Sequence, residues 1–244
     1  MLSNSRVTKL GDLLRGGYDD ASTLTELEEY RSEFIPSYNY VVRVLQEKLY
    51  LSVTGRFKST LSIIEKLRRS SSRLAQIQDI AGCRVVVAST MEQRRVTDSL
   101  RQWFLDIRIV DRTIDSSHGY RAIHVLVKHG GRTVEVQIRT MIQNFWASIS
   151  EKMADIHGQE VKYGGGPPDL QEHLLFLAES FEVAERANED YAKATVRFNS
   201  ARKAAVPNSV WKALREEKAD AKKRFDTSMR QVSRLLSSDK LRGI

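Results

Sequence analysis

Two segments of alternating polar and apolar residues, 120–128 and 132–139, constrain the fold of this chain most strongly. A His-Gly-Gly segment at 129–131 separates them, and glycine tolerates the left-handed backbone of tight hairpin turns. The spacing therefore predicts an antiparallel β-hairpin. Because strand side chains alternate between faces, one face of the second strand carries three polar side chains: Glu135, Gln137 and Arg139.

The residues before this hairpin predict both helices and strands. Residues 82–88 form a short, valine-rich apolar run that is typical of a buried strand. Helical periodicity marks 59–69 and 91–103, and a further strand is expected at 105–112. Helices interspersed with strands, together with one clear hairpin, predict a mixed α/β or α+β sheet domain.

Both ends of the chain are predicted to be helical. Apolar residues recur at helical spacing over 22–51, where Pro36 suits the first turn of a second helix. Residues 169–241 predict two long helices with a turn near 205–208. The sequence therefore predicts three domains: an N-terminal helical segment at 1–50, a central domain with the sheet at 51–166, and a basic C-terminal helical extension at 167–244.

Positive charge is concentrated at the C-terminal end. The net charge is +8, and residues 201–244 contain twelve Lys or Arg against five Asp or Glu. A local basic surplus attracts phosphate-rich partners such as nucleic acid. A solvated helix face without a partner explains such a surplus equally simply.

Several classes of protein are excluded by what the sequence lacks. No apolar run approaches the roughly 18 residues of a transmembrane helix, and no secretory signal is evident, so we expect a cytoplasmic protein without a membrane partner. The single cysteine, Cys83, lies in an apolar run that favours an inert buried thiol. The five histidines are scattered, so no zinc site is predicted.

The segment GRFKSTLSIIEKL at 55–67 carries the clearest local signal for phosphate binding. Arg56 and Lys58 leave an extended segment on the same side, whereas Ser62 and Lys66 stand four residues apart on one helix face. A helix N-terminus adds free N–H groups and positive potential. The spacing differs from that of a P-loop. A basic amphipathic helix without a ligand is the alternative.

Asp79 and Tyr120 each leave two interpretations open. An aspartate that enters the apolar strand at DIAGCR is unfavourable unless a partner compensates its charge. That partner is either Mg²⁺, which prefers carboxylates together with phosphate oxygens, or the guanidinium of Arg84. Tyr120 follows a glycine, so its ring either stacks on a base or packs at the sheet edge.

Four motifs, taken in order, resemble the synthetase domain of RelA/SpoT-type alarmone synthetases: GRFKSTLSIIEKL, DIAGCRVVV, HGYRAIHV and VEVQIRT. The resemblance covers about 40–163 and is closest to the small, single-domain members. It implies a nucleotidyltransferase-related α+β fold, with a mixed sheet flanked by helices. It also implies an ATP-dependent diphosphokinase that transfers the β,γ-pyrophosphate of ATP to a ribose 3′-hydroxyl.

The resemblance assigns roles to residues by their position in the motifs. For ATP, it implies adenine contacts from Arg56 and Arg84, and phosphate contacts from Lys58, Ser62 and Lys66. For Mg²⁺ and catalysis, it implies Asp79 and Glu135, with Glu135 also helping to deprotonate the hydroxyl. For the acceptor, it implies Tyr120, which stacks on the base, together with His124, Gln137 and Arg139.

One departure from the family concerns the acceptor. Members that synthesise nucleotides usually carry a lysine shortly before the Gly-Tyr pair, which holds the 5′ phosphates of the acceptor. This chain has Asp115-Ser116-Ser117-His118 there, with no lysine. The pattern resembles toxic members that modify the 3′ CCA end of tRNA, so tRNA is the favoured acceptor and GDP or GTP the alternative. A toxin would also require an antitoxin protein, and a homo-oligomer is left open.

A third interpretation is a catalytically inactive RNA-binding or regulatory module. The presence of both Asp79 and Glu135 argues against it, because a degenerate site would need to retain neither carboxylate.

Overall fold

The computed structural model describes residues 1–114, 118–204 and 206–237 of the 244-residue chain. These residues form two compact units. The first contains Met1–Val86, Arg95–Asp111 and Ile123–Ile138, and the second contains Val87–Arg94, Arg112–Ala122 and the described part of Arg139–Ile244. Each unit is described by itself, and the three-domain division at residues 50 and 166 stays a prediction.

A five-stranded sheet with the order β1-β2-β5-β4-β3 forms the centre of the first unit. Its strands are β1 (Val53–Phe57), β2 (Ala81–Val87), β3 (Ile107–Asp111), β4 (Ile123–His129) and β5 (Arg132–Thr140). The pairs β1–β2, β3–β4 and β4–β5 are antiparallel. The predicted α+β fold, with helices around a mixed sheet, is confirmed.

The predicted hairpin is the β4–β5 pair. His129 faces Arg132 in the register, so the turn consists of Gly130 and Gly131 alone. Their φ angles of 54° and 79° lie in the left-handed region, which explains why glycine occupies both positions. The first strand begins at Ile123 rather than at residue 120.

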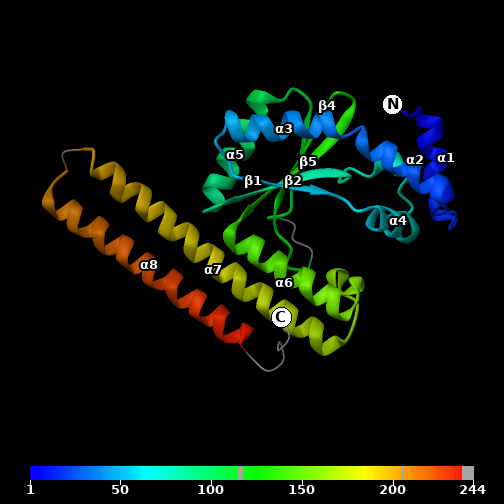
Figure 1. Ribbon diagram of the computed structural model, residues 1–244. Helices are drawn as coiled ribbons and strands as arrows, with labels where there is room; N and C mark the ends of the chain where they lie inside the picture. Colours follow the sequence, from blue (N-terminus) through cyan, green and yellow to red (C-terminus); the bar gives the residue numbers. More distant parts are fainter. Residues whose placement is uncertain (115–117, 205, 238–244) are drawn as a thin grey trace. The chain divides into compact units, whose positions relative to one another are not determined.

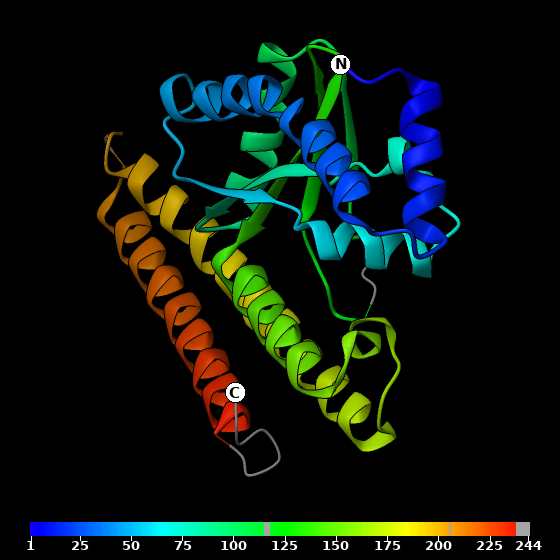
Figure 2. The same ribbon diagram turned by 45° about the vertical axis from the view of Figure 1, so that its right-hand side comes forward.

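The helices of the first unit lie around the sheet (Figure 1). They are α1 (Asn4–Arg15), α2 (Ala21–Ser32), α3 (Ile35–Glu47), α4 (Thr60–Arg69) and the short η1 (Leu74–Gln76), while α5 (Thr90–Trp103) has residues in both units. Buried side chains of α1, α2, α4 and η1 share one apolar cluster, and Figures 1 and 2 both show α1, α2 and α4 side by side. The sequence analysis missed α1.

The second unit consists mainly of long helices, namely α6 (Met141–His157), α7 (Pro168–Ala201) and α8 (Asn208–Leu236), with the short η2 (Gln159–Tyr163). Trp146, Phe181 and Val232 from the three long helices meet in its apolar core. The two helices predicted after residue 169 are confirmed as α7 and α8, which lie side by side in Figures 1 and 2. Residue 205 of the predicted turn, and the predicted helix beyond residue 237, lie outside the described residues.

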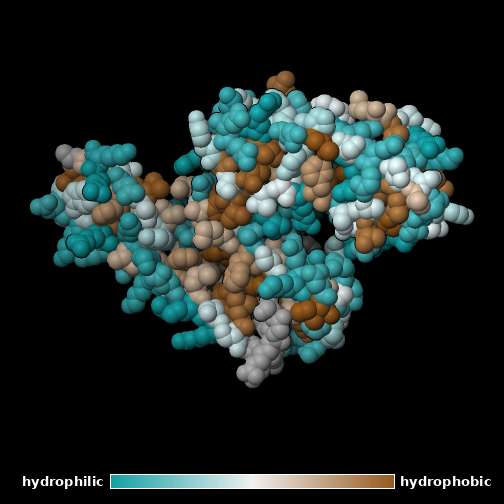
Figure 3. Space-filling view, viewed as in Figure 1, coloured by the Kyte–Doolittle hydropathy of each residue, from teal (hydrophilic) through white to brown (hydrophobic). Residues whose placement is uncertain are grey.

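Only Ala221 and Val232 of α8 are buried, and the outer edge of this helix is largely hydrophilic in Figure 3. None of the described helices combines the length and apolar character that a bilayer crossing requires.

Gly55 of β1 supports a close contact that generates a stability prediction. A Cβ at this position would lie 2.0 Å from the hydroxyl oxygen of Tyr38 and 3.2 Å from its Cζ atom. The Tyr38 ring is held against Phe57, with ring centroids 4.7 Å apart. We therefore expect Gly55→Ala to lower the free energy of unfolding by about 1–3 kcal/mol, measured by urea denaturation.

The same substitution in a Tyr38→Phe background should be less destabilising, because the clashing oxygen is absent. Equal losses in the two backgrounds would show that Tyr38 is not the obstacle.

Candidate functional site

The segment that joins β1 to α4 places two lysines beside Asp79. The backbone N–H of Lys58 donates to the carbonyl of Ile80 at 2.9 Å, so the pairing of β1 with β2 continues one step beyond β1. Ser59 then caps α4, because its Oγ accepts from the N–H of Ser62 at 3.2 Å. The cap fixes where the helix begins and therefore where Lys66 lies on it.

Asp79 is held by both lysines. Lys66 Nζ donates to Oδ1 at 2.8 Å, and Lys58 Nζ donates to Oδ2 at 3.1 Å. Asp79 therefore forms ion pairs, as one of the two interpretations predicted. The partners are these lysines, whereas the sequence analysis considered only Arg84. The Asp79 side chain is 27% exposed, so the pair lies at the protein surface where a ligand has access.

The lysines keep Asp79 ionised. Burial alone would raise the pKa of this carboxyl, but the hydrogen bond from Lys66 and the charges of Lys58 and Lys66 outweigh burial. The pKa of Asp79 therefore lies below its ordinary value, and the group is a carboxylate at neutral pH.

Glu135 receives a separate set of partners from the hairpin. The register pairs His124 with Gln137 across β4 and β5. His124 Nδ1 lies 2.7 Å from Oε1 of Glu135, and Gln137 Nε2 donates to Oε2 at 2.8 Å. Burial would raise the pKa of Glu135, and the nearby charge of Asp79 acts in the same direction, but His124 and Gln137 outweigh them and lower it. The two carboxylates are thus near enough to interact.

The sheet register places both predicted adenine-binding arginines on the face of Glu135. Arg56 is paired with Gly82, and a Cβ at Gly82 would lie 3.6 Å from the Cβ of Glu135, so the two residues share a face. Alternation adds Arg84 to that face. Because Gly82 has no side chain, the flank of Glu135 stays open between these arginines.

The structure thus brings most of the predicted residues together in the first unit. Asp79 and Glu135 interact, Lys58 and Lys66 bind Asp79, and His124 and Gln137 bind Glu135. Ser62 is nearby in sequence, where its hydroxyl accepts from that of Ser59 at 2.9 Å. The roles of all these residues toward a ligand stay predictions.

The other two predicted acceptor residues, Tyr120 and Arg139, belong to the second unit. Arg139 Nη2 donates to the Tyr120 hydroxyl at 2.9 Å, and the guanidinium carbon lies 5.1 Å from the centre of the ring. The Arg139 side chain is almost completely buried, which the alternating pattern did not predict. It fixes one face of the Tyr120 ring.

The sequence analysis missed a polar network beside Tyr120. Arg121 forms ion pairs with Glu182 at 3.3 Å and with Glu185 at 3.5 Å, both on α7. The buried Glu185 also accepts from the Thr140 hydroxyl at 2.6 Å. Two glutamates three residues apart on one helix face were the available signal, but α7 had been interpreted only as a charged helix.

The carboxylates of Asp79 and Glu135 suit a magnesium ion. Mg²⁺ prefers oxygen ligands and usually keeps several waters or phosphate oxygens besides one or two carboxylates. Among the described residues no cluster of three or more His, Cys, Asp or Glu forms a complete metal cage. Two carboxylates would leave positions on such an ion for water or phosphate oxygens.

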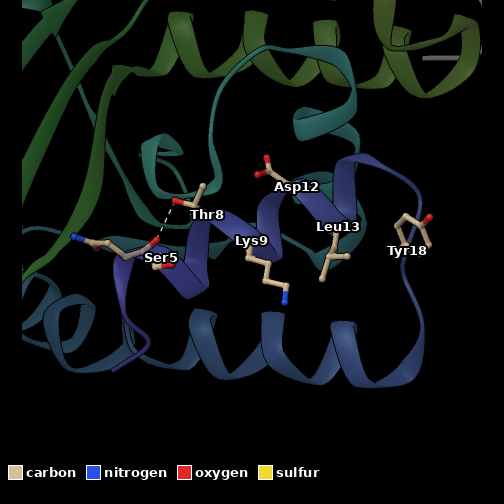
Figure 4. A pocket seen from close by; sticks show the side chains of 7 residues that line it. Ser5, Thr8, Lys9, Asp12, Leu13 and Tyr18 are labelled. Atoms are coloured by element: carbon tan, nitrogen blue, oxygen red, sulfur yellow. Dashed lines mark hydrogen bonds between the residues drawn. The ribbon is translucent and has the colours of Figure 1, made fainter.

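Two other features do not belong to this site. Cys83 is buried, as predicted, and burial raises the pKa of its thiol to about 12. A surface pocket on α1 is lined by Ser5, Thr8, Lys9 and neighbouring residues (Figure 4), and it contains none of the predicted site residues. The departure at Asp115–Ser117 lies outside the described residues.

A family model, related sequences and a solved structure all relate this chain to RelA/SpoT proteins. Residues 55–160 match the family model described as the region found in RelA/SpoT proteins. An uncharacterised protein of Mycobacterium bovis is 31% identical over 207 residues, which cover 78% of this chain and 73% of the relative. The GTP pyrophosphokinase YjbM of Bacillus subtilis is 34% identical over 156 residues, which cover 58% of this chain and 70% of YjbM.

A solved structure, the small alarmone synthetase 1 of Bacillus subtilis bound to its product pppGpp, superposes with a TM-score of 0.54 and 27% identity. It covers 70% of this chain and 98% of its own. All four motifs identified in the sequence lie within residues 55–160.

The ion pairs of Asp79 generate a titration prediction. Because Lys66 lowers the pKa of Asp79, Lys66→Met should raise that pKa toward the value that burial alone would give. The stability that the pair contributes is present at neutral pH and is lost as the pH falls through the pKa of Asp79. Carboxyl-carbon NMR titration of the full chain measures the shift.

Asp20 provides an internal control. Its pKa is lowered chiefly by the backbone N–H of Thr23, so it should titrate identically in both proteins. An Asp79 resonance that titrates at the same pH in wild type and variant would contradict the proposed cause.

Proposed function

Because this chain belongs to the RelA/SpoT family and is a pyrophosphokinase of the small alarmone synthetase type, we propose that it transfers the β,γ-pyrophosphate of ATP to the 3′-hydroxyl of a guanine nucleotide. The observation that carries the proposal is the pair of lysines, Lys58 and Lys66, on Asp79, with Glu135 close enough for the two carboxylate charges to interact. The relatives support the acceptor class, since YjbM is named a GTP pyrophosphokinase and the small alarmone synthetase 1 structure contains pppGpp.

On the side that would bind ATP, Lys58 and Lys66 could exchange Asp79 for phosphate oxygens. Lys66 is 32% exposed and Lys58 is 15% exposed, and both now neutralise Asp79. Phosphate oxygens of ATP would take over these ammonium groups. Lys58 lies just before the start of α4, where free N–H groups also favour anions, and Lys66 lies in the last turn of the helix. Asp79 would then be available, with Glu135, to hold Mg²⁺, which neutralises phosphate charge when it is bound.

In the reaction, the acceptor 3′-oxygen forms a bond to the β-phosphorus of ATP while the bond from that phosphorus to the bridging oxygen of the α-phosphate breaks. AMP is the leaving group, and the hydroxyl proton passes to Glu135 or to solvent. Because the pKa of Glu135 is lowered, this carboxylate is a weak base. Its main contribution is to orient the hydroxyl, with His124 and Gln137 holding the carboxylate in place.

A second candidate acceptor is the 3′ end of tRNA, which the sequence analysis favoured. The specific observation is α8, where eight Lys or Arg and four Asp or Glu lie between residues 212 and 234 on a helix that is mostly exposed. Such a surface suits a phosphate backbone. An antitoxin protein is expected only with this second candidate. The homo-oligomer and the cytoplasmic location remain predictions for either acceptor.

An acceptor assay separates the two candidates. With γ-labelled ATP and Mg²⁺, we expect label to enter GDP or GTP and not deacylated tRNA. Label in tRNA alone would overturn the guanine nucleotide and support the second candidate. In that case, replacing Lys212, Lys223 and Arg230 by Gln should raise the KM for tRNA, more strongly at low salt than at high salt, and leave the KM for ATP unchanged.

Removal of either carboxylate tests the catalytic assignment. Asp79→Asn and Glu135→Gln keep the size of each side chain but remove its charge, so we expect turnover to fall by about two or more orders of magnitude. Asp106→Asn is a matched control, because this aspartate is exposed and pairs only weakly with Lys128 at 3.8 Å. Turnover near the wild-type value in either site variant would contradict the assignment, provided that the thermal midpoint is unchanged.

A further inference from the structure

The sheet order separates two sides of Glu135. Strand β5, which carries Glu135, lies in the middle of the order β1-β2-β5-β4-β3. The proposed ATP-binding residues Arg56 and Arg84 are on β1 and β2, whereas the proposed acceptor residue His124 is on β4. Strand β3 therefore continues the acceptor side, away from the donor.

Arg108 of β3 lies on the same face of the sheet as Glu135. It is paired with Leu126 of β4, and Leu126 is paired with Glu135 of β5. Directly paired residues in antiparallel strands project to the same face. Arg108 is thus two strands from Glu135, which corresponds to about 10 Å between their backbones.

The guanidinium of Arg108 is oriented but its charge is not neutralised within the described residues. Nη2 donates to Oε1 of Gln78 at 2.6 Å, and Gln78 immediately precedes Asp79 in the chain. No carboxylate among the residues that the structure describes forms a hydrogen bond or ion pair with Arg108, and the residue is exposed. Most of its five N–H donors therefore face solvent.

Lys128 shows that this arrangement is specific to Arg108. It follows Leu126 by two residues on β4 and so projects to the same face. Its ammonium group, however, has the carboxylate of Asp106 at 3.8 Å, and its backbone N–H donates to the Asp106 carbonyl at 3.0 Å. Of the two cations, only Arg108 has no carboxylate within ion-pair distance among the described residues, and its hydrogen-bond partner is next to Asp79.

From this placement we infer that Arg108 binds the 5′ phosphates of the acceptor nucleotide and thereby selects acceptors with a free 5′ di- or triphosphate. The inference rests on the proposed function, because it requires a nucleotide whose 3′-hydroxyl faces Glu135. The 5′ phosphates of that nucleotide leave the opposite side of the ribose. On the acceptor side of the sheet they would meet a planar guanidinium, which binds phosphate oxygens in pairs.

The test measures KM and kcat for guanosine, GMP, GDP and GTP with the full-length chain and labelled ATP. Wild type should use GDP and GTP more efficiently than GMP or guanosine. Arg108→Ala should raise the KM for GDP and GTP by about tenfold to a hundredfold, because charge-assisted hydrogen bonds are lost. Its KM for guanosine and for ATP should change by less than about twofold, and Arg108→Lys should restore part of the loss.

Lys128→Ala is the control and should leave all these values unchanged. The inference is overturned if Arg108→Ala keeps the wild-type KM for GDP and GTP, or if it raises the KM for guanosine equally. Failure of the proposed function would look different, since wild type itself would then transfer no label to any guanine nucleotide, and the assignment of Arg108 would fall with it.

Discussion

The candidate site depends on two carboxylates, Asp79 and Glu135, whose charges are close enough to repel each other. The charge of Asp79 opposes the ionisation of Glu135, and burial opposes the ionisation of both. Each stays ionised because its own set of donors compensates it: Lys58 and Lys66 for Asp79, and His124 and Gln137 for Glu135. Without these donors one carboxyl would take up a proton, and a divalent cation would lose half of its protein ligands.

The order of the strands converts this charge arrangement into a site with two sides. Strand β5 holds Glu135 in the middle of the sheet, so the strands on either side offer different partners. Gly82 is required because it has no side chain: a Cβ there would lie only 3.1 Å from the backbone oxygen of Glu135. The reacting groups of donor and acceptor would then meet at the central carboxylate, which is the requirement for transfer between two bound molecules.

The sequence predicted those features that depend on local periodicity. The hairpin, α4 and the long C-terminal helices were found because alternation and helical spacing are visible within short windows. Helix α6 was missed although Thr140 and Gln143 form a capping box that is legible in the sequence. The partners of Asp79, the burial of Arg139 and the pairing of Arg121 with Glu185 connect residues far apart in the chain. No local pattern specifies them, because tertiary packing brings them together.

The same charges also determine in which form the donor suits this site. Lys58 and Lys66 would repel a lone magnesium ion, while Asp79 and Glu135 would repel a lone triphosphate. Under the proposed function, a magnesium–triphosphate complex would satisfy all four groups at once, because the lysines would exchange a carboxylate for phosphate oxygens and the carboxylates would gain a cation. The ion pairs of Asp79 are partly exposed, so replacing them involves little additional desolvation. In this view the lysine–aspartate pairs keep the site balanced until metal and nucleotide arrive together.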